Sequence, residues 1–114
     1  MSVLRCFLRR NENMNEFFKN RIDTAHALID EGQWDTAIEI VQNLKIRIHD
    51  ATVLTQINLH DAEVEKEFNI RYQNIASKAG DPTQSYTQLV MLKKWRSQEY
   101  VKYYDHMLRE HDVQ

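Results

Sequence analysis

Apolar residues in the first part of the chain recur at the spacing of an α-helix. Between residues 14 and 31 they fall three or four positions apart and share one helical face, which carries Phe18, Ile22, Ala25, Leu28 and Ile29. Asn13 followed by Glu16 is typical of a capping box, and Gly32 stands where a left-handed C-terminal cap is expected. The pattern predicts a helix over about 14–31.

A second helix is predicted to begin at Trp34, with an apolar face made of Ala37, Ile38, Val41, Leu44 and Ile48. The turn between the two helices is so short that they should be antiparallel neighbours, forming a hairpin over 14–50. Beyond Asp50 the helical phase slips in a run of β-branched residues. Two interpretations follow: a break near 50–56 before a third helix that ends near Lys78, or one continuous helix over 34–78.

The last helix is predicted over about 84–110, after a loop at 79–85 that holds Gly80 and Pro82. Its apolar stripe carries Leu89, Leu92, Tyr100, Tyr103 and Met107, and Arg96 interrupts the stripe. An arginine in that position must pair with a carboxylate or point into water. The expected fold class is all-α, a small bundle of three to four helices.

Composition supports a chain of few, long helices. The 114 residues include only two glycines and one proline, too few for the many tight turns of a sheet protein. We expect one helical domain over 14–114, preceded by an amphipathic, arginine-rich segment at 1–13. No apolar run reaches the length of a membrane span. The single cysteine, Cys6, indicates a reducing compartment, hence a cytoplasmic protein, with the mitochondrial matrix as the alternative that the arginine-rich segment suggests.

Charge is unevenly distributed, although the formal net charge is only −2. Residues 30–68 carry nine acids and three bases, whereas residues 85–109 carry five bases and two acids. The simplest interpretation is that the acidic and basic helices lie close together in the fold. No global positive charge attracts the chain to nucleic acid.

Motifs for catalysis are scarce. Two glycines cannot build a P-loop, a nucleophile elbow or a dinucleotide fingerprint, and one cysteine cannot form a zinc cluster, so we expect neither an enzyme nor a cofactor. One alternative is left open. The order of His26, His49-Asp50 and Asp105 resembles that of the HD-domain metal phosphohydrolases, and this resemblance implies a divalent metal that activates water.

The last helix mixes basic and aromatic side chains over residues 92–107. This mixture is typical of protein interfaces, because Trp, Tyr and Arg combine a large contact area with hydrogen bonding. It also suits phosphate contacts and base stacking in nucleic-acid binding. The candidate partner-binding residues are Lys93, Lys94, Trp95, Arg96, Tyr100 and Tyr104.

Residues 18–45 resemble the helical hairpin in the C-terminal domain of the J-protein co-chaperones that serve iron–sulfur cluster assembly. The matching positions are Phe18, Arg21, Asp30, Trp34, Asp35, Ala37, Val41, Leu44 and Lys45. In that family the hairpin belongs to a three-helix bundle that binds a scaffold protein. No His-Pro-Asp tripeptide occurs here, so no J domain is implied, and the resemblance suggests partner binding instead of catalysis.

The function that these patterns favour is that of a small helical adaptor, chaperone-like or regulatory protein. It would bind another protein, or a second copy of itself, through the face of the last helix. A nucleic-acid-binding accessory protein is the alternative that the same basic-aromatic face allows, and an HD-type enzyme is the third interpretation.

Overall fold

The computed structural model describes residues 15–78 and 80–111, and these form an all-α bundle, as predicted. Helix α2 spans Glu16–Asp30, α3 spans Trp34–Gln42 and continues into a 3₁₀ turn, η1, over Asn43–Arg47. Two long helices follow, α4 over Ala51–Ser77 and α5 over Pro82–Glu110. The predicted N-terminal segment 1–13 lies outside the described residues. None of the described helices is both long enough and apolar enough to cross a membrane.

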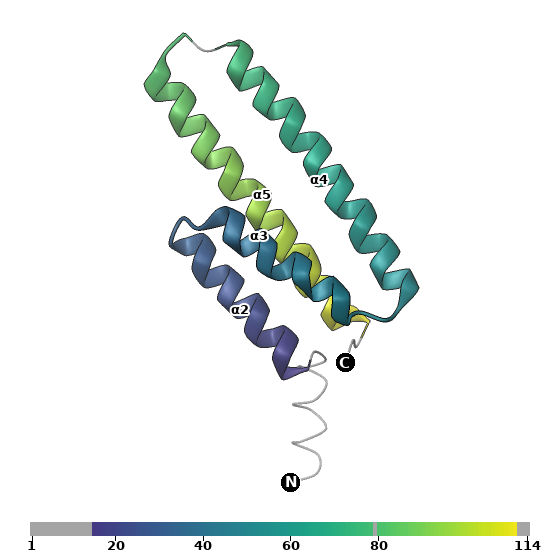
Figure 1. Ribbon diagram of the computed structural model, residues 1–114. Helices are drawn as coiled ribbons and strands as arrows, with labels where there is room; N and C mark the ends of the chain where they lie inside the picture. Colours follow the sequence, from purple (N-terminus) through teal and green to yellow (C-terminus); the bar gives the residue numbers. More distant parts are fainter. Residues whose placement is uncertain (1–14, 79, 112–114) are drawn as a thin grey trace.

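The first hairpin forms where the sequence pattern places it. Asn15, not Asn13, caps α2, because its side-chain oxygen accepts a hydrogen bond from the Phe18 amide at 2.9 Å; Asn13 lies outside the described residues. Gly32 has φ +80°, the left-handed conformation that glycine adopts without strain. Because the chain reverses within three residues, α2 and α3 are antiparallel neighbours (Figure 1).

The chain breaks between α3 and α4, so the continuous helix over 34–78 is the wrong alternative. After Gln42 the α-helix tightens into η1, and Ile48 then takes an extended conformation with its side chain buried. Asp50 caps the next helix by accepting hydrogen bonds from the amides of Thr52 at 2.9 Å and Val53 at 3.2 Å. The β-branched run after Asp50 therefore lies in the first turns of α4.

Helix α5 begins at Pro82, two residues before the predicted position. Proline suits the first turn of a helix, where its missing N–H leaves no hydrogen bond unmade. Asp81 caps the helix by accepting from the Thr83 amide at 3.0 Å. Helices α4 and α5 run antiparallel as one long hairpin, and the shorter α2–α3 hairpin packs beside the C-terminal part of α5 (Figure 1).

The hydrophobic core lies where all four helices meet. It contains Phe18 and Ile22 of α2, Val41 of α3, Ile57 of α4 and Val101 of α5, each at most 1 % exposed. With 27 and 29 residues, α4 and α5 are about 40 and 44 Å long, whereas α2, with 15, is about 22 Å long. The α2–α3 hairpin therefore leaves the far part of α4–α5 uncovered. We call that part, residues 66–78 and 80–95, the arm.

Candidate partner-binding site

Arg96, which interrupts the apolar stripe of α5, is bound by carboxylates of the acidic helices. Its Nε and Nη2 donate to the two oxygens of Glu65 in α4 at 2.6 and 2.9 Å, and its Nη1 lies 3.7 Å from Asp35 of α3. The Tyr100 hydroxyl donates to the same Glu65 carboxylate at 2.7 Å. The prediction that acidic and basic helices lie close together is confirmed here.

A second carboxylate of α4, Asp61, is held at the centre of the bundle. Tyr104 of α5 donates its hydroxyl to Asp61 Oδ2 at 2.9 Å, and Lys45 of η1 places its Nζ 2.7 Å from the same oxygen. Asp61 is only 7 % exposed, and among the described residues its other oxygen has no hydrogen-bond partner. Because a buried carboxylate needs such compensation, these contacts tie α4 to both α5 and η1.

The electrostatics of these groups match a structural role. Burial works against the charge of Arg96, but the hydrogen bond and the charge of Glu65 outweigh it, so the pKa of the guanidinium is raised. Burial, followed by the bond to Glu65, raises the pKa of Tyr100 far above its ordinary value. Burial and the charge of Asp61 do the same to the pKa of Tyr104. Both hydroxyls therefore stay protonated at neutral pH and donate to these carboxylates.

Two of the six predicted contact residues are consequently not available to a partner. Tyr100 is 1 % exposed and Tyr104 is fully buried, so the prediction that they form an exposed contact face is wrong. Arg96 is half-buried and engaged by Glu65, with its guanidinium 4.9 Å from the centre of the Phe68 ring. These three side chains hold the bundle together.

The other three predicted residues lie where a partner could reach them. Lys93 and Lys94 are exposed on α5. Trp95 is half-buried, and the guanidinium of Arg71 in α4 lies over its ring at 4.4 Å from the centre. This cation–π contact bridges the two helices of the arm just beyond the bundle core.

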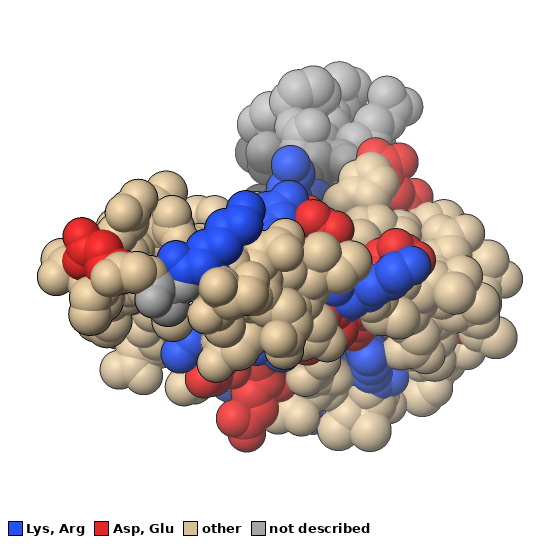
Figure 2. All heavy atoms as spheres, turned by 90° about the horizontal axis from the view of Figure 1, so that it is seen from above, with Lys and Arg blue, Asp and Glu red and all other residues tan. Residues whose placement is uncertain are grey.

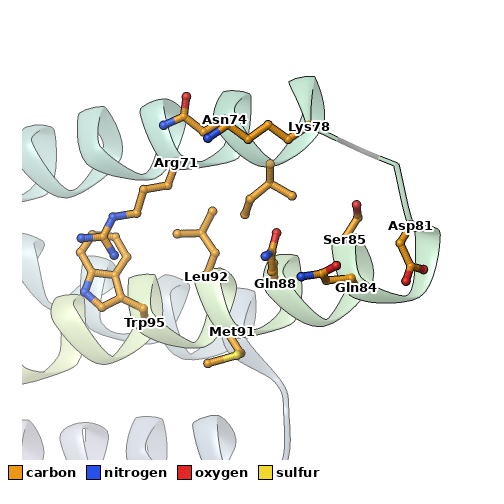
Figure 3. A pocket seen from close by; sticks show the side chains of 11 residues that line it. Arg71, Asn74, Lys78, Asp81, Gln84, Ser85, Gln88, Met91, Leu92 and Trp95 are labelled. Atoms are coloured by element: carbon orange, nitrogen blue, oxygen red, sulfur yellow. The ribbon is translucent and has the colours of Figure 1, made fainter.

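A groove of about 670 Å³ begins at this Arg71–Trp95 contact and runs between α4 and α5 along the arm. Figure 3 shows Leu92 pointing between the two helices, with Met91 at the edge of α5 and Lys78 just after the end of α4, near the far end of the groove. The residues that line the groove are Arg71, Asn74, Ile75, Lys78, Asp81, Gln84, Ser85, Gln88, Met91, Leu92 and Trp95.

The arm also exposes four large apolar side chains, of which Met91 lines the groove and the other three lie outside it. Ile70 and Tyr72 on α4 are 48 % and 41 % exposed, and Tyr86 and Met91 on α5 are 70 % and 66 % exposed. Within the arm only Leu92 belongs to the buried hydrophobic residues of the described chain. The sequence analysis placed Leu92 on the apolar stripe of the last helix but selected none of the four exposed residues as a contact site, although Gln84, Gln88, Met91 and Trp95 recur at helical spacing.

The residues of the alternative functions are arranged differently. In the described part of the chain, no three His, Cys, Asp or Glu side chains are grouped so that they could hold a metal ion. Asp105, one member of the HD-like order, accepts a hydrogen bond from Arg109 at 2.7 Å. On the face that Figure 2 shows, basic side chains form a narrow diagonal row with acidic side chains and uncharged surface beside it.

Comparisons with protein-family models, with curated proteins and with solved structures found no match to this chain. The resemblance of residues 18–45 to the J-protein hairpin therefore stays a prediction from the sequence. The hairpin itself is present, with Trp34 packed against the core.

Proposed function

We propose that this chain is a non-catalytic protein-binding module, an adaptor, chaperone-like or regulatory protein, and that it binds another protein through the arm. The observation that carries the proposal is the uncovered pair of helices, which exposes apolar side chains and a groove between them. In the bundle, by contrast, the apolar faces of α2 and α3 are already buried.

The chemistry of the groove supports this role. Apolar surface that stays exposed on a folded chain marks an interaction site when it is contiguous and has a polar rim. Leu92 and Ile75 supply the apolar floor, Met91 lies at its α5 edge (Figure 3), and glutamines and serine supply the rim. Trp and Arg are enriched at the residues that contribute most to binding energy, so Trp95 with Arg71 is the expected energetic centre.

The arm can be tested with a matched pair of substitutions. Met91 at the groove and Leu59 on the bundle part of α4 are 66 % and 64 % exposed, so Met91→Glu and Leu59→Glu introduce the same charge at equally exposed helical positions. Tagged wild-type and variant chains are used for quantitative affinity purification from an extract of the source organism, and their melting temperatures are recorded.

We expect Met91→Glu to reduce the recovery of specific partners at least about tenfold, the scale of losing one strong interface contact. Leu59→Glu should recover them as the wild type does. Both variants should melt within a few degrees of the wild type, because substitutions at exposed sites change stability by only about 0.5 kcal/mol. Equal recovery by the two variants would refute the arm as the binding site.

A further inference from the structure

The arm differs in charge from the rest of the described chain. It carries five bases, Lys66, Arg71, Lys78, Lys93 and Lys94, against the two acids Glu67 and Asp81. Residues 15–65 carry ten acids against four bases. Both acids of the arm are already engaged: Glu67 pairs with Arg71 at 2.8 Å, and Asp81 caps α5. A ligand that approaches the arm therefore meets a positive local potential.

The groove brings this charge next to its apolar floor. Arg71 of α4 and Lys78, the residue that follows α4, line it at the two ends of the α4 side. Lys78 is exposed and, among the residues that the structure describes, forms no ion pair. The α5 side offers the neutral amides of Gln84 and Gln88. Its one carboxylate, Asp81, lies at the far end.

The dimensions of the groove fit a third helix. The α5 side extends from Asp81 to Trp95 and is about 21 Å long, which is the length of an α-helix of about 14 residues. Two antiparallel helices with an open seam are the usual platform for a third helix, which places apolar residues three, four and seven positions apart into the seam.

We propose that the groove of the arm binds an acidic amphipathic α-helix of a partner protein. This inference rests on the proposed function and names the chemistry of the partner. The apolar stripe of the incoming helix covers Ile75, Leu92 and Met91. Carboxylates that flank the stripe reach Lys78 and the Arg71 guanidinium. Glu67 Oε1 accepts from Nε of Arg71, so Nη1 and Nη2 are the nitrogens that the incoming carboxylate would contact.

Other occupants match the groove less well. The arm of a second copy carries the same sign of charge, and the α2 and α3 helices of a second copy have their apolar faces buried. Residues 1–10 of this chain contain three arginines, Arg5, Arg9 and Arg10, and no acid, so their charge also repels the arm. Charge complementarity therefore selects an acidic helix from another protein.

The decisive experiment compares two displayed peptide libraries. Both hold 16-residue helices with the same apolar stripe, but the flanking positions are Asp or Glu in one library and Lys or Arg in the other. Each is selected against the immobilised full chain after depletion on the Met91→Glu variant. We expect enrichment from the acidic library only, and binding of an enriched peptide should weaken as salt increases.

A second matched pair locates the charge contact. Lys78→Glu at the groove and Lys66→Glu elsewhere on the arm change the net charge equally. An enriched acidic peptide, followed by fluorescence anisotropy, should bind Lys78→Glu about tenfold more weakly than the wild type and Lys66→Glu within about twofold. If both variants weaken binding equally, the peptide is attracted by the net charge of the arm and does not bind in the groove. That result would overturn the inference.

The remaining outcomes separate this inference from the proposed function. The inference of an acidic helix is overturned if the basic library is enriched equally or better, or if the acidic library is not enriched. The proposed function then still stands if Met91→Glu abolishes partner recovery. If the chain sediments as a dimer and Met91→Glu dissociates it, a second copy occupies the groove. If single-stranded oligonucleotides displace the peptide at equal concentration, nucleic acid occupies it. Either result refutes the inference.

Discussion

The hydrogen bond from Tyr104 to Asp61 gives the most direct test of how this bundle is held together. Tyr104 is fully buried, and Asp61 accepts from it at 2.9 Å while pairing with Lys45 at 2.7 Å. Tyr104→Phe removes the donor and keeps the ring. Within the described part of the chain, the Asp61 carboxylate then keeps only the ion pair with Lys45, because its other oxygen has no partner there.

The expected cost follows from the type of bond. A hydrogen bond to a charged group contributes about 1.5–3 kcal/mol, so we expect Tyr104→Phe to lower the free energy of unfolding by about 2 kcal/mol. For a domain of this size each kcal/mol shifts the melting temperature by roughly 4 °C, which gives a fall of about 8 °C. Tyr86→Phe, at a tyrosine that is 70 % exposed, is the matched control and should change stability by less than about 0.5 kcal/mol.

The measurement is urea unfolding followed by circular dichroism, extended to Asp61→Asn and to the double variant. If the two groups interact as the structure shows, the double-mutant cycle should give a coupling energy of about 1 kcal/mol or more. A Tyr104→Phe variant as stable as Tyr86→Phe, or a coupling energy near zero, would refute the reasoning.

The raised pKa of Tyr104 adds a pH dependence to the same test. Burial and the charge of Asp61 raise the pKa in the folded state above the value of about 10 in the unfolded chain. The stability contribution is therefore complete below about pH 10 and is lost as the pH rises beyond it. The free energy of unfolding of Tyr104→Phe should fall less steeply with rising pH than that of the wild type. Identical slopes above about pH 10 would show that Tyr104 is not the source of this pH dependence.

Three further predictions concern the turns and one histidine. Gly32→Ala should cost about 1–2 kcal/mol because φ is +80°, not because of crowding, since the added Cβ would lie 3.9 Å from the Trp34 ring. Asp50→Ala should cost about 1 kcal/mol through loss of the α4 cap; urea unfolding measures both, and wild-type stability would contradict either. Burial lowers the pKa of His60, against the opposing charges of Asp61 and Glu99. Stability should therefore fall as the pH drops below about 6.5. His60→Phe, which keeps the stacking on Tyr103 at 3.8 Å, should show a smaller fall, and an equal fall would exclude His60 as the cause.

The helices were largely predictable from the sequence because residues within and next to each helix indicate where it begins and ends. The periodicity from Phe18 to Ile29, the glycine at 32 and the proline at 82 are local signals, and the structure follows them within about two residues. The sequence did not decide between a break after Gln42 and a continuous helix. An aspartate such as Asp50 can cap a helix or lie on its exposed face, and only the structure shows that it caps α4.

The burial of Tyr104 was not predicted, because α5 is packed on two sides. Sequence reasoning followed one stripe, from Leu89 to Met107, which faces α4. The structure adds further buried residues beside that stripe, Ser97, Val101, Tyr104 and Leu108, because α5 packs against α2 and α3 as well as against α4. A single-stripe interpretation assigns such residues to the surface.

The groove could not be predicted for a different reason. Its existence depends on where the α2–α3 hairpin ends along α5, and this alignment involves contacts between residues far apart in the chain, such as Asp35 of α3 with Arg96 of α5. Periodicity within one helix contains no information about that alignment. Trp95 was selected for its residue type, whereas its neighbour Arg71 comes from another helix.

The unequal lengths of the two hairpins also have a consequence for local motion. Helices in the bundle pack against several neighbouring helices, whereas residues 74–78 and 80–85 belong to the part of the arm where only α4 and α5 pack against each other. Hydrogen–deuterium exchange should therefore be fastest at the tip and slow progressively toward Tyr100, without cooperative loss of the whole fold. A ligand helix bound at the tip would slow exchange there and reduce the difference in exchange rate along the arm, so that binding and local ordering would be coupled.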